Sequence, residues 1–292
     1  MRICLTLSLF LILACSGQLS HFDRDSLEVL IDTGYDVRHP RWSADMSKLL
    51  IEANPDGNWD ILLFDIGSKQ MQNLSSDTAA DRSPSWSPDN QSLVFQSNRN
   101  GQGDLYIYHF GDGSIQQLTN TVQVEMNPDW SPDGRYIAYA VTDSPAAQIE
   151  IIQVADRSVR RISHERFRSL WPRWSGDSRQ LVFFSRRDTD NTDDELYIYD
   201  LNTGSTERIT KLTGHDFTPS FSADYQLIIS SSVRGDDQLL TLFNRRGQAL
   251  DSLNLSYYKR MHSPDWSPRA NQLVFTAQRD SDFYEIVKVK LN

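Results

Sequence analysis

A short motif of Pro, one variable residue, an aromatic and Ser recurs six times along the chain, and it restricts the possible folds more than any other feature. The aromatic residues are Trp42, Trp86, Trp130, Trp174, Phe221 and Trp266, which lie 44, 44, 44, 47 and 45 residues apart. A fixed period between about 20 and 50 residues indicates an array of one repeated structural unit. The chain is therefore expected to consist of six copies of such a unit.

Each unit shows the pattern of four short strands. In the second unit, residues 85–87, 92–96, 104–109 and 115–119 are strand-like, and turn residues such as Asp89-Asn90 separate them. Four strands in about 44 residues are typical of one propeller blade. The sequence predicts an all-β, six-bladed β-propeller with four-stranded antiparallel blades.

The two ends of the chain predict how the ring closes. The last unit supplies only three strands, at residues 264–267, 272–277 and 285–291. Leu30 precedes Trp42 by the same 12 residues that separate Leu74 from Trp86. We expect residues 26–31 to complete the last blade and remove its exposed edge.

The repeated aromatic and the Asp three residues after it are interpreted as structural. The aromatic lies where neighbouring blades would pack, and an Asp at a turn accepts hydrogen bonds from turn amides. In the sixth unit Arg269 replaces this Asp, so that turn must be held in another way.

The first residues predict export and lipidation. Arg2 is followed by an apolar run, so residues 1–14 are read as a signal peptide, and Leu11 to Cys15 resembles a bacterial lipobox. Residues 15–25 then form a tether with lipid on Cys15, and residues 26–292 form the propeller. Ser16 favours the outer membrane, with the propeller facing the periplasm. Ordinary secretion, with Cys15 incidental, is the alternative.

Charge and cysteine content exclude several classes of function. The chain has 39 acidic and 29 basic residues and a net charge of −10. Such a balance argues against general affinity for nucleic acid, because phosphate binding requires clustered Lys and Arg. Cys4 lies in the signal and Cys15 would carry lipid, so no thiol pair remains for a disulfide.

No sequence motif for catalysis or cofactor binding is present, so we expect no catalytic residues, no metal and no cofactor. The acidic stretch at residues 188–195 is spaced like part of a calcium loop, but it lacks the turn Gly and the twelfth-position Glu. A solvated acidic hairpin is the favoured interpretation, and a calcium site is the alternative.

Polar residues just before each repeated Pro are the candidate binding site. A propeller leads the chain there from the outer strand of one blade to the inner strand of the next, close to the axis. Converging polar groups at a concave mouth are a default hypothesis for a ligand site, and ordinary solvated channel residues are the alternative. The candidates are Asp36, His39, Asp81, Glu125, His215, Asp216 and His262, with Arg38 and Arg82 beside them.

The six units resemble the repeats of TolB and its relatives, and Trp130-Ser131-Pro132-Asp133-Gly134 has the full form of their motif. The resemblance covers residues 26–292 and implies a periplasmic propeller that binds other envelope proteins. The α/β domain that precedes the propeller in TolB has no counterpart here.

Two functions remain open at this stage. The first is a non-enzymatic, membrane-tethered scaffold that binds envelope proteins. The second is a binder of a small ligand or glycan, with a lyase or hydrolase activity built from acidic and His residues at the axial mouth.

Overall fold

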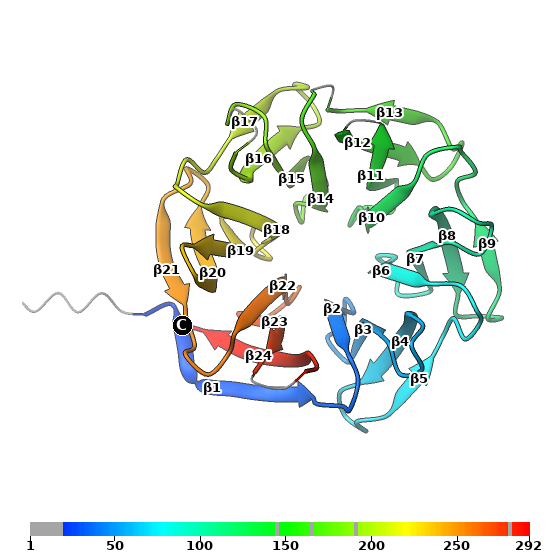
Figure 1. Cartoon of the computed structure of the whole chain (residues 1–292). Helices are drawn as coiled ribbons and strands as arrows, with labels where there is room; N and C mark the ends of the chain where they lie inside the picture. Colours follow the sequence, from blue (N-terminus) through cyan, green and yellow to red (C-terminus); the bar gives the residue numbers. More distant parts are fainter. Residues whose placement is uncertain (1–19, 144–145, 164–165, 190–191, 280–281) are drawn as a thin grey trace, which may run out of the picture.

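The computed structural model describes residues 20–143, 146–163, 166–189, 192–279 and 282–292. It contains six four-stranded antiparallel sheets arranged around a central axis (Figure 1). The inner strands β2, β6, β10, β14, β18 and β22 lie nearest the axis. The predicted all-β, six-bladed propeller is therefore confirmed.

The first three blades follow one another along the chain. Blade one contains β2 (Val37–Trp42), β3 (Lys48–Ala53), β4 (Asp60–Asp65) and β5 (Met71–Asn73). Blade two contains β6 (Asp81–Trp86), β7 (Ser92–Ser97), β8 (Asp104–His109) and β9 (Ile115–Gln117). Blade three contains β10 (Glu125–Trp130), β11 (Tyr136–Asp143), β12 (Ala146–Gln153) and β13 (Val159–Arg161).

The last three blades repeat this order. Blade four contains β14 (Ser169–Trp174), β15 (Gln180–Ser185), β16 (Glu195–Asp200) and β17 (Thr206–Arg208). Blade five contains β18 (His215–Phe221), β19 (Leu227–Arg234), β20 (Asp237–Asn244) and β21 (Ala249–Leu253). Blade six contains β22 (Arg260–Trp266), β23 (Gln272–Gln278), β24 (Glu285–Leu291) and β1 (Phe22–Ile31).

The predicted closing strand is confirmed. β1 pairs antiparallel with β24, for example Val29 with Val287. It begins at Phe22, four residues before the predicted start, because Asp251 of blade five accepts hydrogen bonds from Ser20 Oγ and the His21 amide at 3.0 and 2.7 Å. Since the first strand of the chain lies in the last blade, the ring cannot open without losing a whole strand pair.

The hydrophobic core lies between blades. Along β7, Leu93 and Phe95 belong to a cluster with Leu50 of blade one, whereas Val94 belongs to a cluster with Ile137 of blade three. Successive side chains of β7 thus point alternately to the two neighbouring blades, as expected for a strand that is buried on both faces. Full burial of one such side chain contributes about 1.5–3 kcal/mol, and successive blades therefore stabilise each other.

The aromatic and the Asp of each repeat have the predicted structural roles. Trp42 packs with Val274 and Ile286 of blade six. In five turns the Asp accepts a turn amide as predicted, for example Asp89 that of Gln91 at 3.0 Å. The Ser after the aromatic also donates to this Asp, as Ser87 does to Asp89 at 2.6 Å. This hydrogen bond lowers the pKa of Asp89. In the sixth turn, where Arg269 replaces Asp, Ser267 donates instead to the Ala270 carbonyl.

The predicted signal peptide and Cys15 lie outside the described residues. Within the part that is described, no helix has the length and apolar character needed to cross a membrane.

Candidate functional site

Each inner strand contains a bulge that determines which side chains reach the axis. The residue before each repeated Pro has a left-handed backbone, with φ between 48° and 56°, and the pairing with the second strand shifts there. These bulge residues are His39, Ser83, Asn127, Trp171, Thr218 and Ser263. A bulge breaks the simple in-and-out alternation of a strand, so the side chain after each Pro is turned to the axis.

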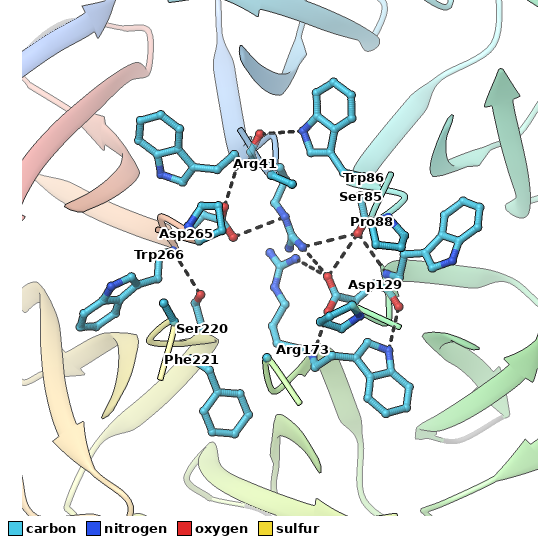
Figure 2. A pocket seen from close by; sticks show the side chains of 18 of the residues that line it. Arg41, Ser85, Trp86, Pro88, Asp129, Arg173, Ser220, Phe221, Asp265 and Trp266 are labelled. Atoms are coloured by element: carbon cyan, nitrogen blue, oxygen red, sulfur yellow. Dashed lines mark hydrogen bonds and ion pairs between the residues drawn. The ribbon is translucent and has the colours of Figure 1, made fainter. Parts of the chain in front are cut away.

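The six residues between the Pro and the aromatic form a ring around the axis, which we call the axial ring. Its members are Arg41, Ser85, Asp129, Arg173, Ser220 and Asp265, so the order Arg, Ser, Asp occurs twice around the six blades. Figure 2 shows Arg41 and Arg173 reaching toward one another at the centre, with Asp129 and Asp265 beside them.

Asp129 is the centre of the charges in this ring. It is 4% exposed and forms ion pairs with Arg41 and with Arg173, the latter at 3.1 Å. Asp265 lies 3.4 Å from Arg41. Burial raises the pKa values of Asp129 and Asp265, and the Arg41 charge opposes this rise for both carboxyls.

The Ser and Asp members also link neighbouring blades. Asp129 accepts the Trp174 amide at 2.8 Å, and Asp265 accepts the Trp42 amide at 2.9 Å. Ser85 accepts the Trp130 amide in the same way, at 3.1 Å. The backbone carbonyls of Arg41 and Asp129 also accept the indole N–H groups of Trp86 and Trp174, at 3.1 and 3.0 Å.

The axial ring forms the floor of a cavity of about 320 Å³. The cavity opens on the side where the first and second strands of each blade are joined, which we call the turn side. Its rim carries one small or apolar residue from each turn, namely Ala44, Pro88, Pro132, Gly176, Ala223 and Pro268. Among the described residues, Arg41 Nη1 and Arg173 Nε have no acceptor. Both atoms are buried, so the mouth combines an apolar rim with a charged floor whose unpartnered donors lie below its surface.

The axis is obstructed in the middle. The rings of His39 and Trp171, which come from blades one and four, are in edge contact with centroids 4.7 Å apart. The cavity between this contact and Arg41 and Arg173 has a volume of only about 10 Å³, about the space of one water. The turn-side mouth is thus separated from the other end, the connection side, where the chain passes from blade to blade.

The predicted candidates fall into three groups on the connection side. Asp36, His39 and His262 lie together: the rings of His39 and His262 are 5.8 Å apart, and Tyr284 lies against His262 and donates its amide to Asp36 at 3.1 Å. His39 Nδ1 is 2.9 Å from the buried Glu52 carboxylate. Burial and the charges of His39, Arg38 and Arg260 hold the pKa of His262 well below its usual value.

Asp81, Glu125 and Asp216 do not belong to an open polar ring. They are 0%, 1% and 1% exposed, and burial raises the pKa of each. Asp81 pairs with Arg99 at 3.1 Å, Glu125 accepts from Thr119 at 3.2 Å, and Asp216 pairs with Arg234 at 2.6 Å. Their side chains satisfy polar groups inside the propeller.

His215 lies apart from the other candidates, beside Asp194. Its Nδ1 atom is 3.1 Å from the Asp194 amide nitrogen and 3.2 Å from the carboxylate. It can accept from the amide when neutral or donate to the carboxylate when protonated, but it cannot do both.

The acidic stretch at 188–195 is only partly described. Asp194 pairs with Arg168 and Arg186, and Glu195 pairs with Arg208. Among the described residues, no group of three or more His, Cys, Asp or Glu side chains is placed to hold a metal ion.

A family comparison agrees with this architecture. The family model of the TolB β-propeller domain matches residues 21–125 and 116–292. The chain belongs to this family. No curated protein matches it in sequence.

Solved structures share the fold at low sequence identity. TolB from Acinetobacter baumannii is 22% identical with a TM-score of 0.73, over 82% of this chain and 59% of that one. A putative TolB from Agrobacterium tumefaciens is 20% identical with a TM-score of 0.70, over 91% and 93%. An oligogalacturonate lyase in complex with manganese is 14% identical with a TM-score of 0.63, over 94% and 96%. This chain thus spans 59% of the length of the Acinetobacter protein.

Sequence reasoning missed the axial ring. The signal was present, because the variable residue of the repeat reads Arg, Ser, Asp, Arg, Ser, Asp in order along the chain. The candidate residues were sought before each repeated Pro, whereas the axial ring is formed by the residue after it.

Proposed function

We propose that this protein is a non-catalytic interaction module of the bacterial cell envelope that binds a peptide segment of a partner protein at its turn-side mouth. The observation that carries this proposal is the cavity of about 320 Å³ with its apolar rim and its Arg-containing floor. Aromatic and Arg side chains in a desolvated centre are typical of the residues that dominate protein interfaces. The TolB-like fold supports the same role.

The residues that line the mouth indicate which chemical groups the bound peptide segment should carry. A small apolar side chain would contact rim residues such as Ala44 and Pro88, and a carboxylate or carbonyl oxygen would approach Arg173. The Arg and Asp side chains of the floor are engaged with one another, which suits a rigid binding surface better than acid–base chemistry.

We further propose that lipid on Cys15 holds the propeller at the periplasmic face of the outer membrane. The described chain begins at Ser20, close to Asn292 and to Asn271 in the first turn of blade six, on the turn side. Four residues separate Cys15 from Ser20, so the five peptide steps between them can span at most about 18 Å. The mouth would then meet partners that lie close to the same membrane.

The test is crosslinking in intact cells followed by mass spectrometry. Ala223→Glu places a charge on the exposed rim without removing a floor contact, and Gln116→Glu places the same charge on the exposed outer strand β9 as a control. We expect one dominant envelope partner that is lost with Ala223→Glu and kept with Gln116→Glu. Partners unchanged by Ala223→Glu would exclude the mouth, and no partner at all would exclude the interaction role.

The lipid is tested separately by mass measurement of the mature protein from membranes. Diacylglycerol on Cys15 and loss of residues 1–14 are expected. A soluble protein cleaved elsewhere would contradict the anchor and leave the test of the mouth intact.

A further inference from the structure

A second cavity lies on the connection side between blades four and five and has a volume of about 310 Å³. We call it the blade-four pocket, and its lining consists of Arg168, Trp171, Phe184, Arg186, Asp194, His215 and Phe217. Because every blade follows one template, the corresponding positions in other blades show which of these side chains the fold requires.

The charge balance of the pocket is the reverse of that found around Arg99 in blade two. Arg168 binds both oxygens of Asp194, at 2.9 and 2.8 Å through Nη2, and Arg186 binds the same carboxylate at 2.9 and 3.2 Å. Two guanidinium groups thus share one carboxylate. On the same side, Arg99 contacts two acids, Asp77 and Asp81.

The arginines are not needed for the blade itself. In the repeat, Arg186 occupies the position of Asn54, Asn98 and Thr142 in the first three blades, and Arg168 that of Asp36, Ala80 and Val124. Those three blades form the same sheet without a cation at either place. Blade six has Arg260 at the position of Arg168 but Gln278 at that of Arg186, so blade four combines both arginines.

The walls of the pocket are aromatic where other blades are polar or small. Trp171 corresponds to Ser83 and Asn127, and Phe184 corresponds to Glu52 and Gln96. The rings of Phe184 and Phe217 meet edge to face at 6.5 Å, and the Arg168 guanidinium lies 5.7 Å from the centre of the Phe184 ring.

Donors remain for a ligand. Arg168 and Arg186 use Nε and Nη2 on Asp194, and neither Nη1 atom has a partner among the described residues. Their side chains are 40% and 27% exposed, so solvent reaches both. Burial favours the protonated form of Asp194, but the hydrogen bonds from Arg186 and Arg168 lower its pKa overall. The Asp194 carboxylate therefore stays ionised at neutral pH.

We propose that the blade-four pocket binds a small carboxylate that carries a flat aromatic ring. The ring packs against Trp171, Phe184 and Phe217, and the carboxylate accepts from the free Nη1 donors of Arg168 and Arg186. Arg168 and Arg186 together carry two positive charges, and Asp194 carries one negative charge. The remaining positive charge matches a monoanion, and planar guanidinium groups fit a carboxylate. The volume is near the lower end of the range of ligand pockets, which suits a molecule with a single ring.

The probe is benzoate, followed by saturation-transfer NMR and titration calorimetry on the folded propeller. Benzamide has the same shape without the charge, and acetate has the charge without the ring. We expect benzamide to bind at least tenfold more weakly than benzoate, because a charge-assisted hydrogen bond is worth about a factor of ten. Acetate should also bind at least tenfold more weakly, because it cannot bury an aromatic ring against the pocket walls. No saturable binding of benzoate, or equal binding of benzamide, would overturn the proposal.

Two variants locate the site. Arg186→Gln is expected to weaken benzoate at least tenfold, and Phe217→Leu to weaken it severalfold by removing one wall. Arg82→Gln is the matched control, because Arg82 also lies beside an aromatic ring on the connection side, 4.6 Å from the centre of Trp59. A thermal melt of each variant confirms folding, and Phe217→Leu keeps the test available if Arg186→Gln does not fold.

Retention of full affinity in both pocket variants, or an equal loss in Arg82→Gln, would place benzoate elsewhere and refute the proposal. The axial ring takes no part in these contacts, so failure here leaves the turn-side proposal untouched.

Discussion

The two sides of the propeller use the same repeat in different ways. On the turn side, five of six turns carry the same Ser–Asp hydrogen bond, and the axial ring repeats Arg, Ser, Asp. On the connection side, the bulge position alone holds His39, Ser83, Asn127, Trp171, Thr218 and Ser263. The turn side supplies acceptors that join neighbouring blades. The connection side repeats a Ser or Thr acceptor for a backbone amide in four blades but varies at its bulge positions. Positions that repeat therefore have structural roles, and positions that differ between blades are where ligand-specific chemistry can be built.

The largest expected effect is at the centre of the axial ring. Asp129→Ala leaves Arg41 and Arg173 without their shared partner and the Trp174 amide without its acceptor. Breaking a buried charge cluster from one side costs about 3–5 kcal/mol, measurable by urea unfolding. Asp265→Ala should cost less, because Arg41 and the Trp42 amide are its only polar partners in the described part of the chain. Equal losses in the two variants would contradict the central role of Asp129.

A smaller effect is expected on the connection side. Asp81→Asn removes the buried charge that pairs with Arg99, and the loss of a hydrogen bond to a charged group is expected to cost about 2–3 kcal/mol of unfolding free energy. The matched control is Asp77→Asn, which contacts the same Arg99 from a side chain that is 40% exposed. We expect it to cost less than about 1 kcal/mol. A negligible effect of Asp81→Asn would contradict a structural role of its ion pair with Arg99.

The smallest effect is a pH dependence from His262. Its pKa lies well below 6.5 in the folded state, so between the two pKa values the unfolded chain binds more protons. The free energy of unfolding should therefore fall as the pH is lowered through about 6.5. His262→Gln should flatten this decline, and chemical denaturation at pH 7.5 and 5.5 would measure it. Identical curves would show that burial and the charges of His39, Arg38 and Arg260 do not keep His262 neutral.

The sequence predicted the fold because each element depends on a local pattern that recurs. Trp42, the Ser87–Asp89 turn and the closing strand were placed by spacing alone, and the exceptional turn at Arg269 was identified by the missing Asp. The start of β1 was placed too late because the contacts of Ser20 and His21 with Asp251 are long-range and leave no local signal.

The site could not be read in the same way. The bulge at each Pro changes which face the following side chains take, so alternation along β6 does not reveal that Asp81 is buried and Ser85 faces the axis. The contact between His39 and Trp171 joins opposite blades and depends on closure of the whole ring. Such contacts follow from the tertiary structure.

The axial ring also shows that a repeated sequence does not produce a symmetric charge distribution. Its six residues have an approximate two-fold pattern, yet both guanidinium groups meet at Asp129, and among the described residues only Arg41 pairs with Asp265. The floor of the mouth is therefore polarised, with two cations on the Asp129 carboxylate and one on the Asp265 carboxylate. A bound segment would thus meet two different halves of the floor, so the mouth can favour one orientation of that segment over the other.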